Sequence, residues 1–397
     1  MTKKETNSKT SNSFIVSQYY GFKKMSKFKV NDTDTEKSKS IKKNSEYLDK
    51  VLRPVEEQLA LFRTCSELED KRTEYPALVY QEDSPKGDHK KPRLKTGDKN
   101  ISLHIIGTPK SIAEALLIKT ALSILEEEGI KDVSLEINSV GGKESLAQFT
   151  KELNAYYRKN MNSMSQTCKQ LFKEGSHSLV SCGSKEVKKM SEEAPSSLDF
   201  LSEDDRKHFS EVIEFLESEN IPYEVNKNVL GDPYYSSHTV FTIINKKDGK
   251  IVATGTRCNN ISKKVMGRKE MPTTSLTLLL NNPKKASVPA FPERARHKFC
   301  FIQLGNDAKF SGLKVIETLR KAKIPVYQSL SRDRLSSQLE IAERNRVPYI
   351  LLMGQKEAMD QTVVVRDTKT HSQIPVPIKT LVPYLRNILK GLDKAGK

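Results

Sequence analysis

The last quarter of the chain alternates between two kinds of segment. Short runs rich in Val, Ile and Leu predict buried strands, and longer stretches with apolar residues three and four positions apart predict amphipathic helices. This alternation is typical of a small parallel or mixed sheet flanked by helices, so we predict an α/β domain over residues 297–397. Its expected strands are KFCFIQL, PVYQS, PYILLMG, TVVVRD and QIPVPI, and its expected helices span 312–323, 334–345 and 380–392.

Residues 51–282 carry further helix and strand patterns and are predicted to form a second domain. The clearest helix spans 109–128 and stops at Gly129, a typical C-terminal signal. A proline-rich, basic stretch at 283–296 is the expected linker between the two domains. Residues 1–50 are polar and Lys-rich except for a short apolar patch at 14–22, so we expect this region to be largely disordered.

The positive charge of the chain is large and local. The net charge is +17, which favours polyanionic partners such as nucleic acid. Residues 297–397 hold 18 Lys and Arg against 9 Asp and Glu, and residues 86–100 hold 6 against 2. Clustered positive charge of this kind is typical of RNA-binding faces.

Other features narrow the class of protein. No apolar run approaches the roughly 20 residues that span a bilayer, and the N-terminus has no apolar leader, so we expect a cytoplasmic protein. The five cysteines have no metal-ligand spacing, and we expect reduced thiols and no bound metal.

Several stretches resemble histidyl-tRNA synthetase, in the order and spacing of that family, over about residues 51–392. The similar segments are VLRPVE (51–56) with T-L-R-P-E-G, KDVSLEINSVGG (131–142) with K-D-V-T-L-x-I-N-S-L-G, EAPSSLDFL (193–201) with A-P-x-L-x-D-Y-L, YYSSHTVFTI (234–243) with the histidine-specific strands, and LLMGQKEAMDQTVVVRD (351–367) with the anticodon-binding domain.

The resemblance implies a fold and an activity. The fold is an α+β class II synthetase-like antiparallel sheet core with a helical insertion near 144–200, followed by an anticodon-binding-like α/β domain. The family's activity is the ATP-dependent attachment of histidine to tRNA, with ATP and Mg²⁺ required. The family dimerises through motif 1, which we do not recognise before Val51, so a homodimer is left open.

The residues that would activate histidine are largely absent. Activation brings a carboxylate to the α-phosphate of ATP, so catalysis depends on cations held in place, and arginine suits this task because its planar fork binds phosphate. The resemblance puts Lys86, Gly231 and Asn282 where the family has arginines. It also puts Tyr234 at an aspartate, Thr242 at a glutamate and residues 259–265 at the Gly-rich G-G-R-Y-D-G-L. No catalytic set is intact, and the expected vestigial pocket consists of Arg53, Lys86, Asp88, Asn100 and Tyr235.

Basic and amide side chains supply the candidate RNA contacts. One group opens a helix or follows a strand in the C-terminal domain, and the other lies in a polar loop of the core. The alternative for both is an ordinary solvated surface. The candidates are Arg332, Arg334, Gln338 and Lys356 in the C-terminal domain and Lys90, Lys91 and Arg93 in the loop.

The leading hypothesis is therefore a catalytically inactive relative that binds tRNA or another structured RNA through its basic C-terminal domain, with no cofactor. A divergent but active histidine–tRNA ligase is the first alternative. A synthetase-like regulatory subunit is the second, although such relatives usually lack the anticodon-binding domain.

Overall fold

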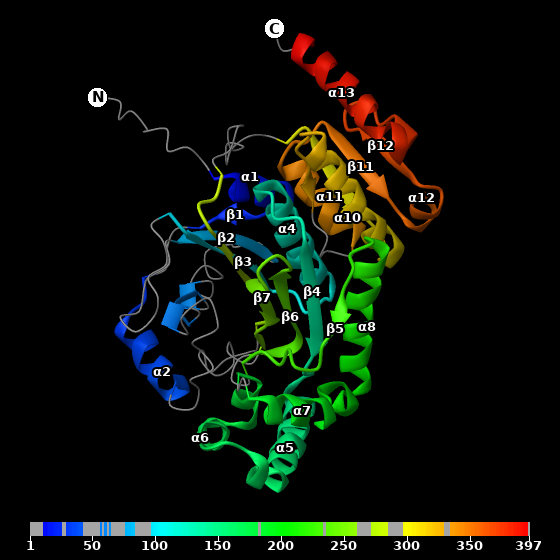
Figure 1. Cartoon of the computed structure of the whole chain (residues 1–397). Coiled ribbons are helices and arrows are strands. Elements are labelled where there is room, and N and C mark those ends of the chain that lie inside the picture. The colour runs from blue at the N-terminus through cyan, green and yellow to red at the C-terminus, as the bar shows by residue number, and fades with distance from the viewer. Residues whose placement is uncertain are drawn as a thin grey trace, which may run out of the picture.

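The computed structural model contains two sheets, each with helices packed against it (Figure 1). One sheet lies in the core region and the other in the C-terminal region. The structure describes residues 11–25, 29–42, 56–57, 59–61, 63–64, 76–83, 97–181, 184–232, 236–259, 271–284, 297–328 and 334–395.

Within the described residues, the core sheet has eight strands. They are β1 (Lys23–Lys24), β2 (Ala77–Asp83), β3 (Lys99–Ile106), β4 (Val133–Ser139), β5 (Glu224–Val225), β6 (Ser237–Asn245), β7 (Lys250–Arg257) and β8 (Thr273–Leu280). Their order is β1-β2-β3-β8-β7-β6-β4-β5, antiparallel through the centre with one parallel pair at each edge. This arrangement confirms the antiparallel core that the resemblance implies.

One face of the core sheet is apolar and carries helices. These are α1 (Asn12–Tyr19), α4 (Ile112–Glu128) and α8 (Glu203–Ser218). Most side chains of α4 are buried because the sheet, α1 and α8 surround it. The helix ends at Gly129 as predicted, where a φ of 89° lets the amides of Gly129 and Ile130 bond carbonyls of the last turn.

The insertion forms a small helical unit with a core of its own. Its helices are α5 (Lys143–Lys159), α6 (Gln166–Glu174) and α7 (Lys185–Glu193), and they lie at the opposite end of the molecule from the C-terminal domain in Figure 1. Cys168 is buried in this unit and is disulfide-bonded. The expectation of reduced thiols is therefore wrong for Cys168, because spacing along the chain does not show which cysteines folding brings together.

The C-terminal domain is a mixed five-stranded sheet with helices, as predicted. Its strands are β9 (Phe299–Gln303), β10 (Tyr327–Gln328), β11 (Tyr349–Met353), β12 (Thr362–Asp367) and β13 (Gln373–Pro377), in the order β10-β9-β11-β12-β13. The first three in this order are parallel, and the last two pair antiparallel. Its helices are α10 (Asn306–Lys321), α11 (Leu335–Arg344), α12 (Gln355–Met359) and α13 (Ile378–Ala395).

Part of the N-terminal region is folded, although we expected residues 1–50 to be largely disordered. Phe14, Val16 and Tyr20 belong to the main apolar core, and β1 extends the core sheet beside β2. A further helix, α2, spans Asp32–Lys42. The apolar patch was recognised in the sequence, but its partners in α4 and the sheet are distant in the chain; burying its side chains against them stabilises the segment by more than ordering it costs.

A polar network, buried except at Glu127, joins the N-terminal segment, the core and the C-terminal domain. We call it the domain junction, and it consists of Tyr20, Ser123, Glu127, Glu317 and Arg320. The Tyr20 hydroxyl donates to Glu317 of α10 and lies 2.8 Å from the Ser123 hydroxyl of α4. Arg320 bonds Glu317 at 2.8 Å and Glu127 at 2.7 Å. Burial opposes ionisation of Glu317, but Arg320 and Tyr20 outweigh it and lower its pKa to about 2.

Within the described part of the chain, no helix has the length and apolar character needed to cross a membrane.

We expect removal of the Tyr20 hydroxyl from the domain junction to destabilise the protein more than removal of a tyrosine hydroxyl at the surface. Tyr20→Phe should lower the free energy of unfolding by about 1.5–3 kcal/mol, because a buried carboxylate loses a hydrogen-bond donor. The urea midpoint measures this. Tyr223→Phe is the matched control, since its hydroxyl also bonds a glutamate, Glu217, but at the surface. Equal shifts in the two variants would contradict the junction's role.

Candidate functional site

The face of the core sheet opposite α4 is polar, and we call it the polar face. Two rows of residues in register cross it from β2 to β4. The first row is Gln81, Ser102, Thr277, Thr254, Thr242 and Glu136, and the second is Val79, His104, Ser275, Thr256, Val240 and Asn138. Alternation along each strand keeps these side chains together on one side, while their neighbours point to the apolar core.

Much of the polar face is already hydrogen-bonded and covered. Ser102 and Thr277 lie 3.4 Å apart, and His104 Nδ1 lies 2.8 Å from the Ser275 hydroxyl. These four side chains are between 0% and 7% exposed. Thr254, Thr256 and Thr242, toward β6 and β7, are half-buried. The accessible part of the face is therefore a group of threonine hydroxyls.

The polar face has little charge. Among the described residues of the two rows, Glu136 is the one carboxylate, and neither row holds a lysine or arginine. The Glu136 carboxylate accepts a 2.9 Å hydrogen bond from the Asn226 side chain. Hydroxyl and amide groups of this kind can position a neutral or polar molecule, but they do not offset the charge of a triphosphate.

A buried arginine lies on the other side of the sheet. The guanidinium of Arg257, at the end of β7, donates to both carboxylate oxygens of Glu114 at 2.7 and 2.5 Å. It also donates to the carbonyls of Thr108 and Lys110 at 2.9 Å each. The side chain is 0% exposed. Arg257 therefore fastens β7 to the start of α4 and is unavailable to a ligand on the polar face.

The charge state of Glu114 follows from its neighbours. Burial alone would raise its pKa, but Arg257 and then His208 oppose burial and lower the pKa to about 2. His208 Nε2 lies 2.9 Å from a Glu114 oxygen. Sequence analysis did not single out this pair, because a glutamate in the first turn of a helix and an arginine in a distant strand carry no joint signal.

A second buried carboxylate anchors the insertion. Asp205 accepts hydrogen bonds from the Ser145 hydroxyl at 2.6 Å and the Gly142 amide at 3.0 Å, and it lies 3.1 Å from His238 Nδ1. Burial opposes ionisation of Asp205, but these donors hold its pKa well below the usual range. Asp205 and its partners therefore tie α5, α8 and β6 together.

The expected vestigial pocket is described only in part. Asn100 lies on β3, has the same orientation as Ser102 and His104, and so belongs to the polar face. Arg53, Lys86, Asp88 and Tyr235 lie outside the described residues. For those four the expectation stays a prediction.

Two other positions that the resemblance equates with family arginines lie among the described residues. Gly231 has a φ of 64°, and a Cβ there would come within 3 Å of the Ser236 and Val240 side chains. Asn282 follows β8 with a φ of 46°, and its side chain lies directly against Gly97. A side chain at position 231 would therefore need local rearrangement, whereas Asn282 is exposed.

The candidate RNA residues of the C-terminal domain separate into two groups. Arg334 and Lys356 are exposed, and they follow β10 and β11 at the carboxyl edge of the parallel strands. Gln338 is 1% exposed, and its amide donates to the Gln303 carbonyl at 2.9 Å, so it holds α11 on β9 and does not lie on the surface. Four candidates lie outside the described residues, namely Arg332, Lys90, Lys91 and Arg93.

Comparisons with known proteins show which proteins the chain resembles. Residues 298–388 match the anticodon binding domain family. Proteins named histidine–tRNA ligase align with the chain at 26% identity in Clostridium perfringens and 27% in Fervidobacterium nodosum, covering 72% and 73% of this chain and 69% of each relative. This chain is a histidyl-tRNA synthetase-like protein. The crystal structure of apo S. aureus histidyl-tRNA synthetase also aligns, with 16% identity, a TM-score of 0.48 and coverage of 93% of this chain and 92% of that one.

No group of three or more His, Cys, Asp and Glu side chains among the described residues of the synthetase-like chain could hold a metal ion.

The buried ion pair predicts a characteristic pattern in a double-mutant cycle. Arg257→Met should lower the free energy of unfolding by about 3–5 kcal/mol, because it leaves the Glu114 charge buried without its partner. The double variant Arg257→Met with Glu114→Gln should be more stable than Arg257→Met alone, since both charges are then gone. Chemical denaturation at neutral pH measures both, and additive losses would contradict the pairing.

The stabilities of the wild type and the double variant should also depend differently on pH. Glu114 has a folded-state pKa below its ordinary value of 4.5, so its ionised form contributes stability that is fully present above about pH 4.5 and is lost as pH falls toward 2. The double variant should therefore lose less stability than the wild type over this window.

Proposed function

We propose that this protein binds tRNA or another structured RNA through its C-terminal domain and does not activate histidine. The observation that carries the proposal is the match of residues 298–388 to the anticodon binding domain family. A tRNA-binding role would place the protein in the cytoplasm, where tRNA is used.

The charge and position of the C-terminal residues support RNA binding. Residues 297–397 have a net charge of +9. Arg334 and Lys356 are exposed at one edge of the sheet, where loops after parallel strands gather. Cations placed this way bind phosphates and position an RNA without reading its sequence.

The polar face supports the loss of activation. The described residues of its two rows supply hydroxyls, amides and one carboxylate where phosphate transfer would need fixed cations. The resemblance places Gly231 and Asn282 at two positions where the family has arginines. Lys86, at a third such position, keeps the positive charge but lacks the planar guanidinium that binds phosphate. Each lost donor costs about 10²–10³ in rate.

An active histidine–tRNA ligase is the second candidate. It is favoured by the names of the relatives, which are ligases. ATP and Mg²⁺ would then be required.

Histidine-dependent ATP–pyrophosphate exchange distinguishes the two candidates. We expect exchange at the background rate, because the α-phosphate charge would lack its guanidinium partners. The histidine–tRNA ligase of Clostridium perfringens, assayed beside it, is the positive control. Exchange within about tenfold of that control would establish the ligase candidate instead.

Titration with tRNA tests the binding proposal. The logarithm of the binding constant should fall linearly with the logarithm of salt concentration, and Arg334→Ala and Lys356→Ala should each weaken binding and reduce that slope by about one. Lys250→Ala is the matched control, since Lys250 is exposed on β7 of the core. Point variants are preferred to deletion of the domain, which would expose the domain junction. Equal losses of tRNA affinity in all three variants would contradict the proposal that the C-terminal domain binds the RNA.

A further inference from the structure

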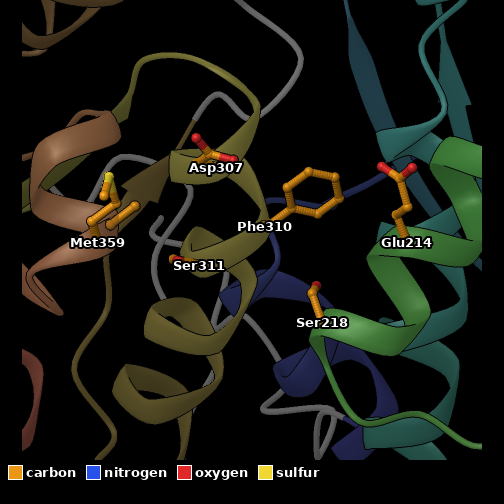
Figure 2. Close-up of a pocket in the computed structure, with 7 residues that line it drawn as sticks. Glu214, Ser218, Asp307, Phe310, Ser311 and Met359 are labelled. Atoms are coloured by element: carbon orange, nitrogen blue, oxygen red, sulfur yellow. The ribbon is translucent and has the colours of Figure 1, made fainter.

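A groove lies where the core meets the C-terminal domain, on the outside of the domain junction. It has a volume of about 330 Å³ and is lined by Glu214 of α8, Asp307 and Phe310 of α10, and Ala358 and Met359 of α12. Figure 2 shows the Phe310 ring pointing from α10 toward α8, between the two carboxylates. The candidate RNA contacts and the polar face do not use these residues.

The floor of the groove is apolar and firmly supported. The Phe310 ring packs on the Phe215 ring of α8 with centroids 4.2 Å apart, and Ala358 is buried. Met359 is 75% exposed, well above the other exposed large apolar side chains of the described residues, which are at most 47% exposed. A bulky apolar side chain left in solvent next to a hollow is typical of a surface that another molecule covers.

The charge of the groove is opposite to that of the protein. The net charge of the chain is +17, yet both charged residues that line the groove are carboxylates, Glu214 and Asp307. Lys314 and Lys356 are exposed on α10 and α12 but do not line it. An RNA backbone would be repelled here, whereas a lysine or arginine side chain would be attracted.

The size and rigidity of the groove limit the occupant further. Its volume is at the low end of the roughly 300–1,000 Å³ of ligand pockets, which suits one large side chain better than a whole cofactor. The domain junction fixes α10 against α4, so the walls are in place before anything binds. We propose that this groove docks a protein partner through a basic segment that carries one bulky apolar anchor, the anchor lying on Phe310 and Met359 and its cations facing Glu214 and Asp307.

Peptide selection on the full-length protein tests the proposal, and the test does not depend on RNA binding. A displayed library of random peptides is selected on the wild type and counter-selected on Met359→Glu. We expect enriched peptides to hold Leu, Met or Phe within one helical turn of Lys or Arg. A synthetic copy of the most enriched peptide should bind Met359→Glu about tenfold more weakly, and likewise Asp307→Lys.

The control is Ile374→Glu, which places the same charge on another exposed apolar position, on β13. This variant should bind the peptide as the wild type does. The urea midpoint of each variant checks that its fold is unchanged. The proposal is overturned if no enriched peptide depends on Met359, or if the enriched peptides are acidic. It is also overturned if Met359→Glu weakens tRNA binding as strongly as Lys356→Ala, since the groove would then be part of the RNA surface.

Discussion

Burial of a few charged groups at the domain junction decides how the parts of this molecule fit together. Glu317 and Arg320 of α10 are removed from solvent, and each is stable there only because Tyr20, Ser123 and Glu127 complete its hydrogen bonds. Those partners come from the N-terminal segment and from α4. The C-terminal domain can therefore leave the core only by exposing apolar surface and by separating a buried charge from its donors, which is costly. The positions of the exposed cations and of the groove both follow from this attachment.

The two faces of the core sheet have different roles. Its apolar face packs on α1, α4 and α8, and the Arg257–Glu114 pair fastens the end of β7 to the start of α4. Its polar face keeps the strand frame of a synthetase-like core, and apart from Glu136 the two rows hold no carboxylate, lysine or arginine; some of their side chains bond one another. A fold can persist while the groups on one face change, because the apolar face provides most of the stability and the polar face carries the groups that could contact a ligand. The proposed function is consistent with this division.

Sequence reasoning succeeded where the signal is local and failed where it is not. Gly129 marked the end of α4, and the strand and helix alternation of the C-terminal domain gave its mixed sheet. Gln338 was grouped with the surface residues because it opens a polar helix, but it points inward to the edge of β9. The patch around Phe14 was recognised as apolar but not as part of the core, since its partners on α4 and the sheet lie far away in the chain.

The sequence by itself determined most elements of the core and the C-terminal domain, the positive charge and the family resemblance. Periodicity, turn residues and composition are properties of neighbouring residues, so they can be read without a structure. Only the tertiary structure decided which charges meet. The pairing of Arg257 with Glu114 and the closing of the domain junction by Tyr20 join residues from distant segments, and Glu214 and Asp307 come from different helices to line one groove. Burial gives the first two contacts a strength that the same side chains would not have in water, and no local pattern predicts it.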